Sequence, residues 1–197
     1  MAGYSVLQDA GASIVQLLFN ELSTDPQTGG LIDAPDKISQ SSPKEVKDDN
    51  SPALLSVYLY RVVENPYVKN QFPVPGPGGT FRKPPLTLDL NYMITPLLKE
   101  PEDRQIVLGK VMKVLYDKAI LEGADLTPPL DAEDEPIRLT LNPVPLEEIT
   151  KVWQAMELDY KLSVCYIARV TFLESDRTAS SSRVVEKTSN YGEAVTQ

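Results

Sequence analysis

The residue types that most often carry out chemistry in proteins are scarce in this chain. It has no histidine and a single cysteine, Cys165. Histidine is the commonest general base and metal ligand, so its absence excludes Ser-His-Asp and Cys-His catalytic arrangements. Cys165 lies in an apolar stretch with no histidine to activate it, and we interpret it as a structural residue. The chain is therefore expected to hold other proteins rather than to turn over a substrate.

Carboxylates and one glycine-rich loop are the remaining candidates, and each has a simpler interpretation. Glu102-Asp103 and Glu147-Glu148 could serve acid–base chemistry, but both pairs open predicted helices, where the helix dipole favours negative charge. The acidic run at 131–135 lacks the ligand spacing of a calcium loop. The run GPGGTFRK at 76–83 lacks the Gly-Lys-Ser/Thr order of a phosphate loop. We predict no catalytic, cofactor or metal site, and a small enzyme that uses carboxylates is the alternative from a different class.

Composition limits the class of protein and its partners. With 197 residues, of which 42% are hydrophobic, the chain is long enough for one domain with a core. Its net charge of -9 argues against nucleic acid and against an anionic membrane surface, since both require a basic face. One cysteine permits no internal disulfide, which fits a reducing compartment. Without a signal peptide or a membrane-spanning run, the chain is expected to be made and assembled in the cytosol.

The periodicity of the apolar residues predicts the elements that position any functional surface. Steps of three and four residues predict helices at Tyr4–Leu22, from Pro101 to about Leu121, and from Pro145 through Trp153 to Met156. Alternation predicts strands at Ala53–Val63, Leu86–Ile94, Ile137–Leu141 and Tyr160–Leu173. Residues 26–52 are interpreted mainly as a connection, with one short strand around Lys37–Gln40. We assign the large aromatic side chains to the core rather than to a partner: Tyr58, Tyr60, Tyr92, Trp153 and Tyr166.

Together these elements predict an α+β fold in a single domain of residues 1–173. We expect a mixed or antiparallel sheet of about four to five strands, flanked on one side by about three helices. Residues 73–85 are rich in proline and glycine, so they are expected to form a long exposed loop rather than a helix or a central strand. Residues 174–197 are expected to form an extended, flexible tail. Its segment Arg183–Glu186 either adds a strand to a neighbour's sheet or belongs to a disordered terminus.

Four segments in a fixed order resemble one protein family: LSVYLYRVVENPYVKN at 55–70, LTLDLNYMITP at 86–96, EDRQIVLGKVMKVLYDKAIL at 102–121, and the strand, Trp-bearing helix and strand of 137–172. They are similar to the cap, or tail-terminator, proteins of phage-tail-like contractile injection systems of the antifeeding-prophage and virulence-cassette type. The resemblance implies a structural protein that forms a homohexameric ring. The ring would sit on the last inner-tube hexamer and contact the last sheath ring, in a particle that is either released or anchored at a membrane.

Candidate partner-binding residues follow from this resemblance and lie on three segments. Arg61, Glu64, Tyr67 and Lys69 lie in or after the predicted strand Ala53–Val63, and Phe81 and Arg82 lie in the loop at 73–85. Arg183, Val184, Val185 and Lys187 form the candidate donated strand of the tail. Another tail component of related fold, such as a second cap, a tube adaptor or a baseplate protein, is the alternative within the structural class.

Overall fold

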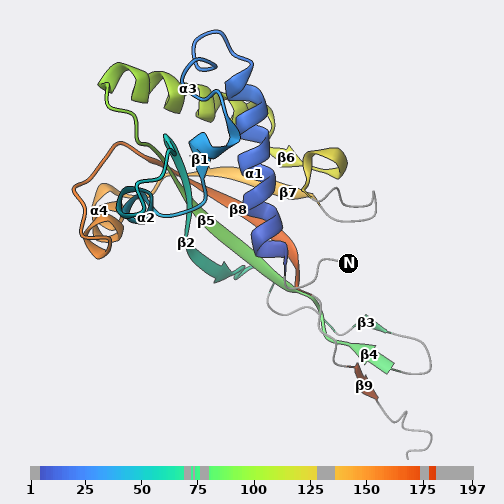
Figure 1. Ribbon diagram of the computed structural model, residues 1–197. Coiled ribbons are helices and arrows are strands. Elements are labelled where there is room, and N and C mark those ends of the chain that lie inside the picture. Colours follow the sequence, from blue (N-terminus) through green and yellow to red (C-terminus); the bar gives the residue numbers. More distant parts are fainter. Residues whose placement is uncertain are drawn as a thin grey trace, which may run out of the picture.

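The computed structural model describes residues 5–68, 72, 74–75, 80–127, 136–173 and 178–180, and these residues form the predicted α+β fold (Figure 1). The helices are α1 (Val6–Ser23), α2 (Pro43–Asp48), α3 (Pro101–Asp117) and α4 (Leu146–Ala155). One mixed sheet has the strand order β1 (Ile38–Ser39), β2 (Leu55–Glu64), β5 (Leu86–Pro96), β8 (Val164–Leu173), β7 (Ile137–Asn142) and β6 (Ile120–Leu121). A small second sheet has the order β3 (Val74–Pro75), β4 (Thr80–Arg82) and β9 (Thr178–Ser180).

Helices cover both faces of the main sheet, so the expectation of helices on one side is wrong. The adjacent residues Tyr92 and Met93 are both buried but point to opposite faces, because side chains alternate along a strand. Tyr92 belongs to the larger core cluster with residues of α1 and α3. Met93 belongs to a second cluster with Trp153 of α4 and with Cys165, which we interpreted from the sequence as a structural residue. Helix α4 therefore covers the apolar residues on this second face.

Helix α1 packs closely on the main sheet through an apolar stripe and a glycine. Its buried residues include Ala10, Ile14 and Leu18, which recur at four-residue steps and face the core. A Cβ atom added at Gly11 would lie 2.3 Å from Gln40 Oε1 and 3.4 Å from Tyr92 Oη. Only glycine therefore lets the helix approach the sheet this closely without moving the Gln40 side chain.

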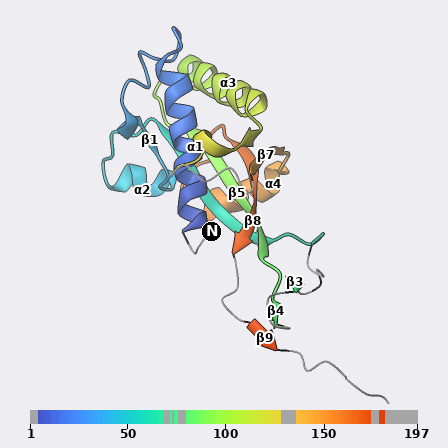
Figure 2. The same ribbon diagram turned by 90° about the vertical axis from the view of Figure 1, so that its right-hand side faces the viewer.

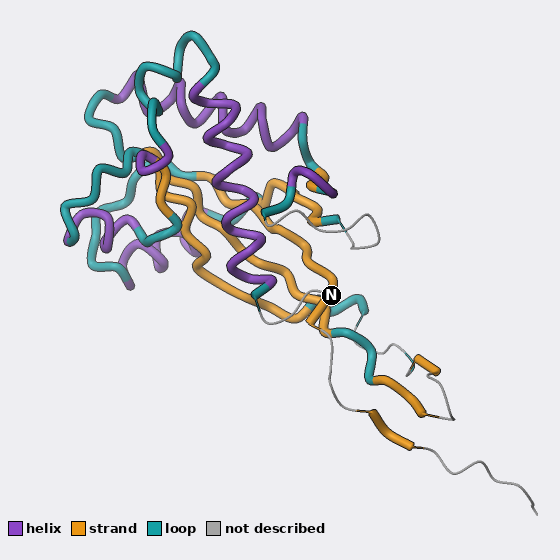
Figure 3. Tube along the Cα trace, turned by 45° about the vertical axis from the view of Figure 1, so that its right-hand side comes forward, coloured by secondary structure: helices purple, strands orange, loops and turns teal. Residues whose placement is uncertain are grey.

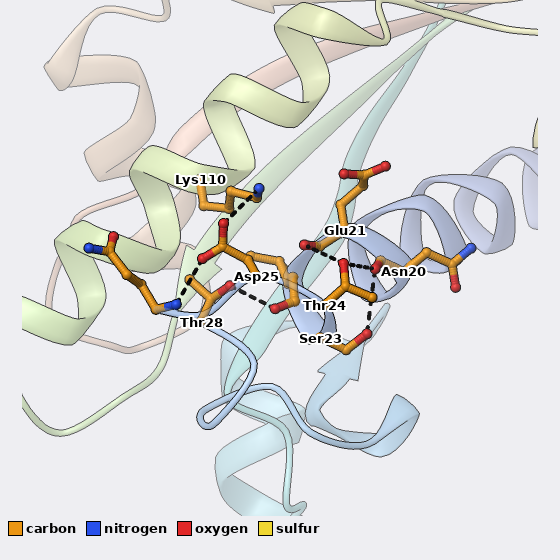
Figure 4. Close-up of polar contacts among 9 residues, drawn as sticks. Asn20, Glu21, Ser23, Thr24, Asp25, Thr28 and Lys110 are labelled. Carbon is orange, nitrogen blue, oxygen red and sulfur yellow. Dashed lines mark hydrogen bonds and ion pairs between the residues drawn. The ribbon is translucent and has the colours of Figure 1, made fainter.

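A polar turn fixes the end of α1 against α3 (Figure 4). The Thr28 hydroxyl donates a hydrogen bond of 2.7 Å to the Leu22 carbonyl, and the Thr24 hydroxyl donates one of 2.9 Å to the Asn20 carbonyl. Lys110 Nζ of α3 lies 2.9 Å from Asp25 Oδ2. The ammonium holds the pKa of the Asp25 carboxyl below its usual value, mainly through this hydrogen bond. These contacts set the position at which the chain leaves α1.

The small sheet projects from one end of the main sheet as an arm, defined here as β3, β4 and β9 (Figures 2 and 3). Strand β4 is the central strand of this arm, so the expectation that the long loop at residues 73–85 contains no central strand is wrong at Thr80–Arg82. The three residues Thr80–Arg82 contain neither proline nor glycine, and both of their edges can therefore form hydrogen-bonded ladders. Strand β9 brings a segment of the predicted tail back onto β4.

Other predicted boundaries shift in ways that the local contacts explain. Helix α3 ends at Asp117 rather than near Leu121, because Ile120 and Leu121 pair with β7. Strand β8 starts at Val164 rather than Tyr160. Helix α2, inside the stretch interpreted as a connection, begins with a capping box in which Ser42 Oγ accepts the Glu45 N–H at 3.2 Å. The Glu45 carboxylate accepts the Ser42 N–H at 2.7 Å in return. The short strand expected around Lys37–Gln40 is confirmed as β1.

Candidate assembly interface

The first candidate surface is the outer edge of β2. Along its other edge this strand pairs with β5 over most of its length, but on the outer edge it pairs with β1 only at Leu55 and Ser56. Within the described part of the chain, no strand covers the outer edge from Val57 to Val63. Such an edge presents backbone N–H and C=O groups to which a partner's strand can add. A shift in register between Leu59 and Arg61 marks an irregularity on this strand, a feature that limits uncontrolled edge-to-edge pairing.

Three of the predicted contact residues lie at this edge and just beyond it. Arg61 and Glu64 are exposed residues of β2. Tyr67 follows the strand with 89% of its surface exposed, so its ring is available to a partner. The turn before it is fixed, because Asn65 Oδ1 accepts the Tyr67 N–H at 3.0 Å and Asn65 Nδ2 donates to Asp89 Oδ1 at 3.1 Å. These three residues therefore lie on one continuous segment, and their contact with a partner stays a prediction.

The second candidate surface is the arm. Phe81 lies at the centre of β4, opposite Pro75 of β3 and Ala179 of β9. Arg82 is the last residue of β4 and lies opposite Val74 and Thr178. The structure places this pair at a distance from β2, at the projecting end of the molecule, so the predicted residues do not form one cluster (Figure 1). The predicted residues Lys69, Arg183, Val184, Val185 and Lys187 lie outside the described residues.

A third surface was missed by the sequence interpretation. On the sheet face that carries α4, the strand residues are apolar beneath the helix and polar beyond it. Asp89 of β5 lies opposite Arg169 of β8, which in turn lies opposite Arg138 of β7. Arg61 lies opposite Asn91, two residues along β5 from Asp89, so it shares the same face. We call this set the open sheet face: Arg61, Asp89, Asn91, Arg138 and Arg169.

The open sheet face was detectable in principle from alternation. Arg169 is spaced two and four residues from Ile167 and Cys165, so a strand places all three on one face. The sequence shows this spacing, but it does not show that α4 covers only the Cys165 end. Arg169 Nε lies 3.2 Å from Asp89 Oδ1, and the side chains keep 47% and 14% of their surface exposed.

Burial, rather than a catalytic arrangement, causes the largest shifts among the titratable groups described. It raises the pKa of Tyr92 and of Tyr166, and it is the main reason that the pKa of Tyr60 rises to about 12. Burial also raises the pKa of the Cys165 thiol, which keeps it protonated and unreactive. Among the described residues, no group of three or more His, Cys, Asp or Glu side chains gathers to hold a metal ion. No helix in the described part is long and apolar enough to cross a membrane.

Comparison with known proteins shows the family to which this chain belongs. The model of the Pvc16 N-terminal domain matches residues 9–187, which is most of the chain. The chain belongs to the Pvc16 N-terminal domain family. This confirms the resemblance found in the sequence. No curated protein matches the chain.

Solved structures with a similar fold include two from contractile systems. One is the PVC sheath/tube terminator of an extracellular contractile injection system in its extended state, with a TM-score of 0.61 and 17% identity. That match covers 100% of this chain and 67% of the other. Another is the tube terminating cap of the anti-feeding prophage, with a TM-score of 0.47 and 20% identity over 71% of this chain and 49% of that one. The first similarity supports the α+β fold over the whole length of the chain.

Proposed function

We propose that this protein is the structural cap, or tail terminator, of a contractile injection system. The observation that carries the proposal is the similarity of the whole chain to a sheath/tube terminator, together with membership of the Pvc16 N-terminal domain family. The proposed action is non-enzymatic: the protein binds the distal end of the inner tube and the sheath and thereby ends polymerisation. We further propose that six copies form a ring and that assembly takes place in the cytosol.

The surfaces described above suit a component that must end a polymer. A terminator accepts contacts from the last ring but must not offer an identical site for another ring. The outermost strands of the main sheet, β1 and β6, are only two residues long, so neither of these two strands gives more than a short template for continued pairing. The outer edge of β2 and the arm are the places at which a strand from the tube or the sheath would add. The tail segment Arg183–Lys187 remains our candidate for a strand donated in the other direction.

The proposal is tested by deleting the gene in its own host and measuring particle lengths by electron microscopy. Particles of scattered or excessive length, or with sheath loosened at the distal end, are expected. Complementation with the intact gene should restore a single length, which controls for effects on neighbouring genes. Normal particles of uniform length from the deletion strain would overturn the terminator role. Gold labelling of the chain at the baseplate instead of the distal end would favour a different tail component.

A further inference from the structure

The open sheet face carries a concentration of positive charge that the fold itself does not neutralise. Arg138 and Arg169 lie directly opposite each other on β7 and β8, and like charges in this position destabilise a sheet. Arg61 lies on the same face, one strand beyond Asp89. Within the described residues, Arg169 is the only one of these arginines with an ion pair, and its partner is Asp89. The sheet therefore holds two arginines in register on neighbouring strands, and no carboxylate of the described residues forms an ion pair with Arg138.

The carboxylates near this face do not balance its charge. Asp89 already pairs with Arg169 and accepts a hydrogen bond from Asn65, and it lies two strands away from Arg138. Glu148, at the start of α4, lies close enough to Tyr60 to raise the pKa of that phenol, and Arg61 acts on the same phenol in the opposite direction. Among the described residues, the open sheet face thus carries Arg61, Arg138 and Arg169 together with Asp89, in a chain whose net charge is -9. The described part of this face is basic while the molecule is acidic.

We propose that the open sheet face docks carboxylates of a second copy of this chain. Two copies that each carry a net charge of -9 repel one another on average. A local basic face on one copy can nevertheless attract acidic side chains of the other. The arginines meet a different, acidic surface of the neighbour, so the contact is heterologous and can repeat around a closed ring. This inference rests on the ring arrangement proposed above and assigns it a surface.

Arginine suits this role better than lysine does. Its planar guanidinium can form two parallel hydrogen bonds with one carboxylate, so an opposed pair can hold neighbouring carboxylates in a fixed orientation. The same chain carries an exposed acidic side chain, Glu102, in the first turn of α3. Contacts of this kind weaken as salt is added, because mobile ions screen the charges.

The test replaces Arg138 by lysine, which keeps the charge and introduces an amine that a carbodiimide can link directly to a carboxylate in contact. Equal amounts of unlabelled and ¹⁵N-labelled full-length R138K protein are mixed at low salt and also added to particles from the deletion strain. Mass spectrometry then identifies the peptides joined to position 138. Native Lys47, exposed on α2, reports random linkage in the same sample.

We expect peptide pairs that join position 138 to an acidic residue with mixed isotope labels, well above the Lys47 background. The further change Arg169→Glu should lower their yield about tenfold or more, as the loss of a desolvated charge contact predicts. Links only within one chain, links only to sheath or tube peptides, or no link above background would each overturn the proposal. Gold labelling of the added protein on the same particles reports separately whether it binds the distal end, so failure of the terminator role is recognised independently.

Discussion

Replacing Tyr92 by phenylalanine is expected to stabilise the protein, although Tyr92 lies at the centre of the fold. The side chain is 1% exposed, and its ring packs in the larger core cluster between the sheet and α1. Its hydroxyl is enclosed and has no hydrogen-bond partner among the described residues. The ring therefore contributes apolar burial while the hydroxyl carries a desolvation cost that nothing in the described structure offsets.

The size of the effect follows from the single atom that is removed. An enclosed polar group without a partner costs about 1–3 kcal/mol, and Tyr92→Phe removes it while keeping the ring. Allowing for the small void left behind, we expect a gain of about 1 kcal/mol in the free energy of unfolding. For a chain of this length, that gain corresponds to a rise in Tm of about 2–4 °C.

Alkaline pH should increase the difference between the variant and the wild type. Burial raises the pKa of Tyr92 above its ordinary value of 10.0, so the unfolded chain loses this proton at a pH where the folded chain still holds it. The stability of the wild-type protein must then fall as the pH rises above 10. Phenylalanine does not titrate, so the variant should lose less stability over the same range.

Urea unfolding at neutral pH and at pH 10.5 measures both effects. Tyr166→Phe is the matched control, since Tyr166 is also buried in the same cluster but its hydroxyl is not among the enclosed atoms without a partner. We expect a change within about 0.5 kcal/mol for the control. A loss of 1 kcal/mol or more in Tyr92→Phe would refute the reasoning, because it would mean that the hydroxyl has a partner, such as a water molecule or the nearby side chain of Gln40.

Three further predictions concern contacts at α4, α2 and the end of α1. Trp153→Ala should lower the free energy of unfolding by about 3–5 kcal/mol, measured by urea unfolding, since Trp153 is the largest fully buried side chain; a loss below 1 kcal/mol would contradict the packing of α4. Ser42→Ala should cost about 1 kcal/mol by removing the capping box, whereas the neighbouring Ser41→Ala should leave stability unchanged. Lys110→Gln should raise the pKa of Asp25 toward 3.8 in an NMR titration. It should also remove the stability that the Asp25–Lys110 pair gives the wild-type protein above pH 3.8, which the wild type loses as the pH falls through the lowered pKa of Asp25. An unchanged pKa would disprove the contact.

Periodicity was sufficient to predict the long elements of the fold. Leu90, Tyr92 and Ile94 alternate along β5 and all lie in the larger core cluster, as predicted. The position of Trp153 in the core was likewise predicted and is confirmed. These predictions succeed because burial of one face is a local property of each element, and the sequence records it directly.

Pairing between short segments could not be predicted in the same way. Strand β4 is three residues long, and it is a strand because β3, which comes just before it in the chain, and β9, from a distant part of the chain, lie on either side of it. The opposed position of Arg138 and Arg169 depends on the register between β7 and β8, and a shift of one residue would place Arg138 on the other face. The candidate interface thus depends on pairing between segments far apart in the chain. The spacing of residues within one segment does not predict such pairing.

The attachment of the arm determines how the molecule bears a mechanical load. Strand β5 starts and β8 ends at the same end of the main sheet, where Leu86 lies opposite Leu173. In the chain, β4 precedes β5 and β9 follows β8, so tension on the arm enters the body through its two middle strands. Because the ladder bonds run across the strands, a pull along them strains the bonds to β2 and β7 together in shear, rather than opening them one at a time. The sheet is therefore strongest in the direction in which the arm would be pulled.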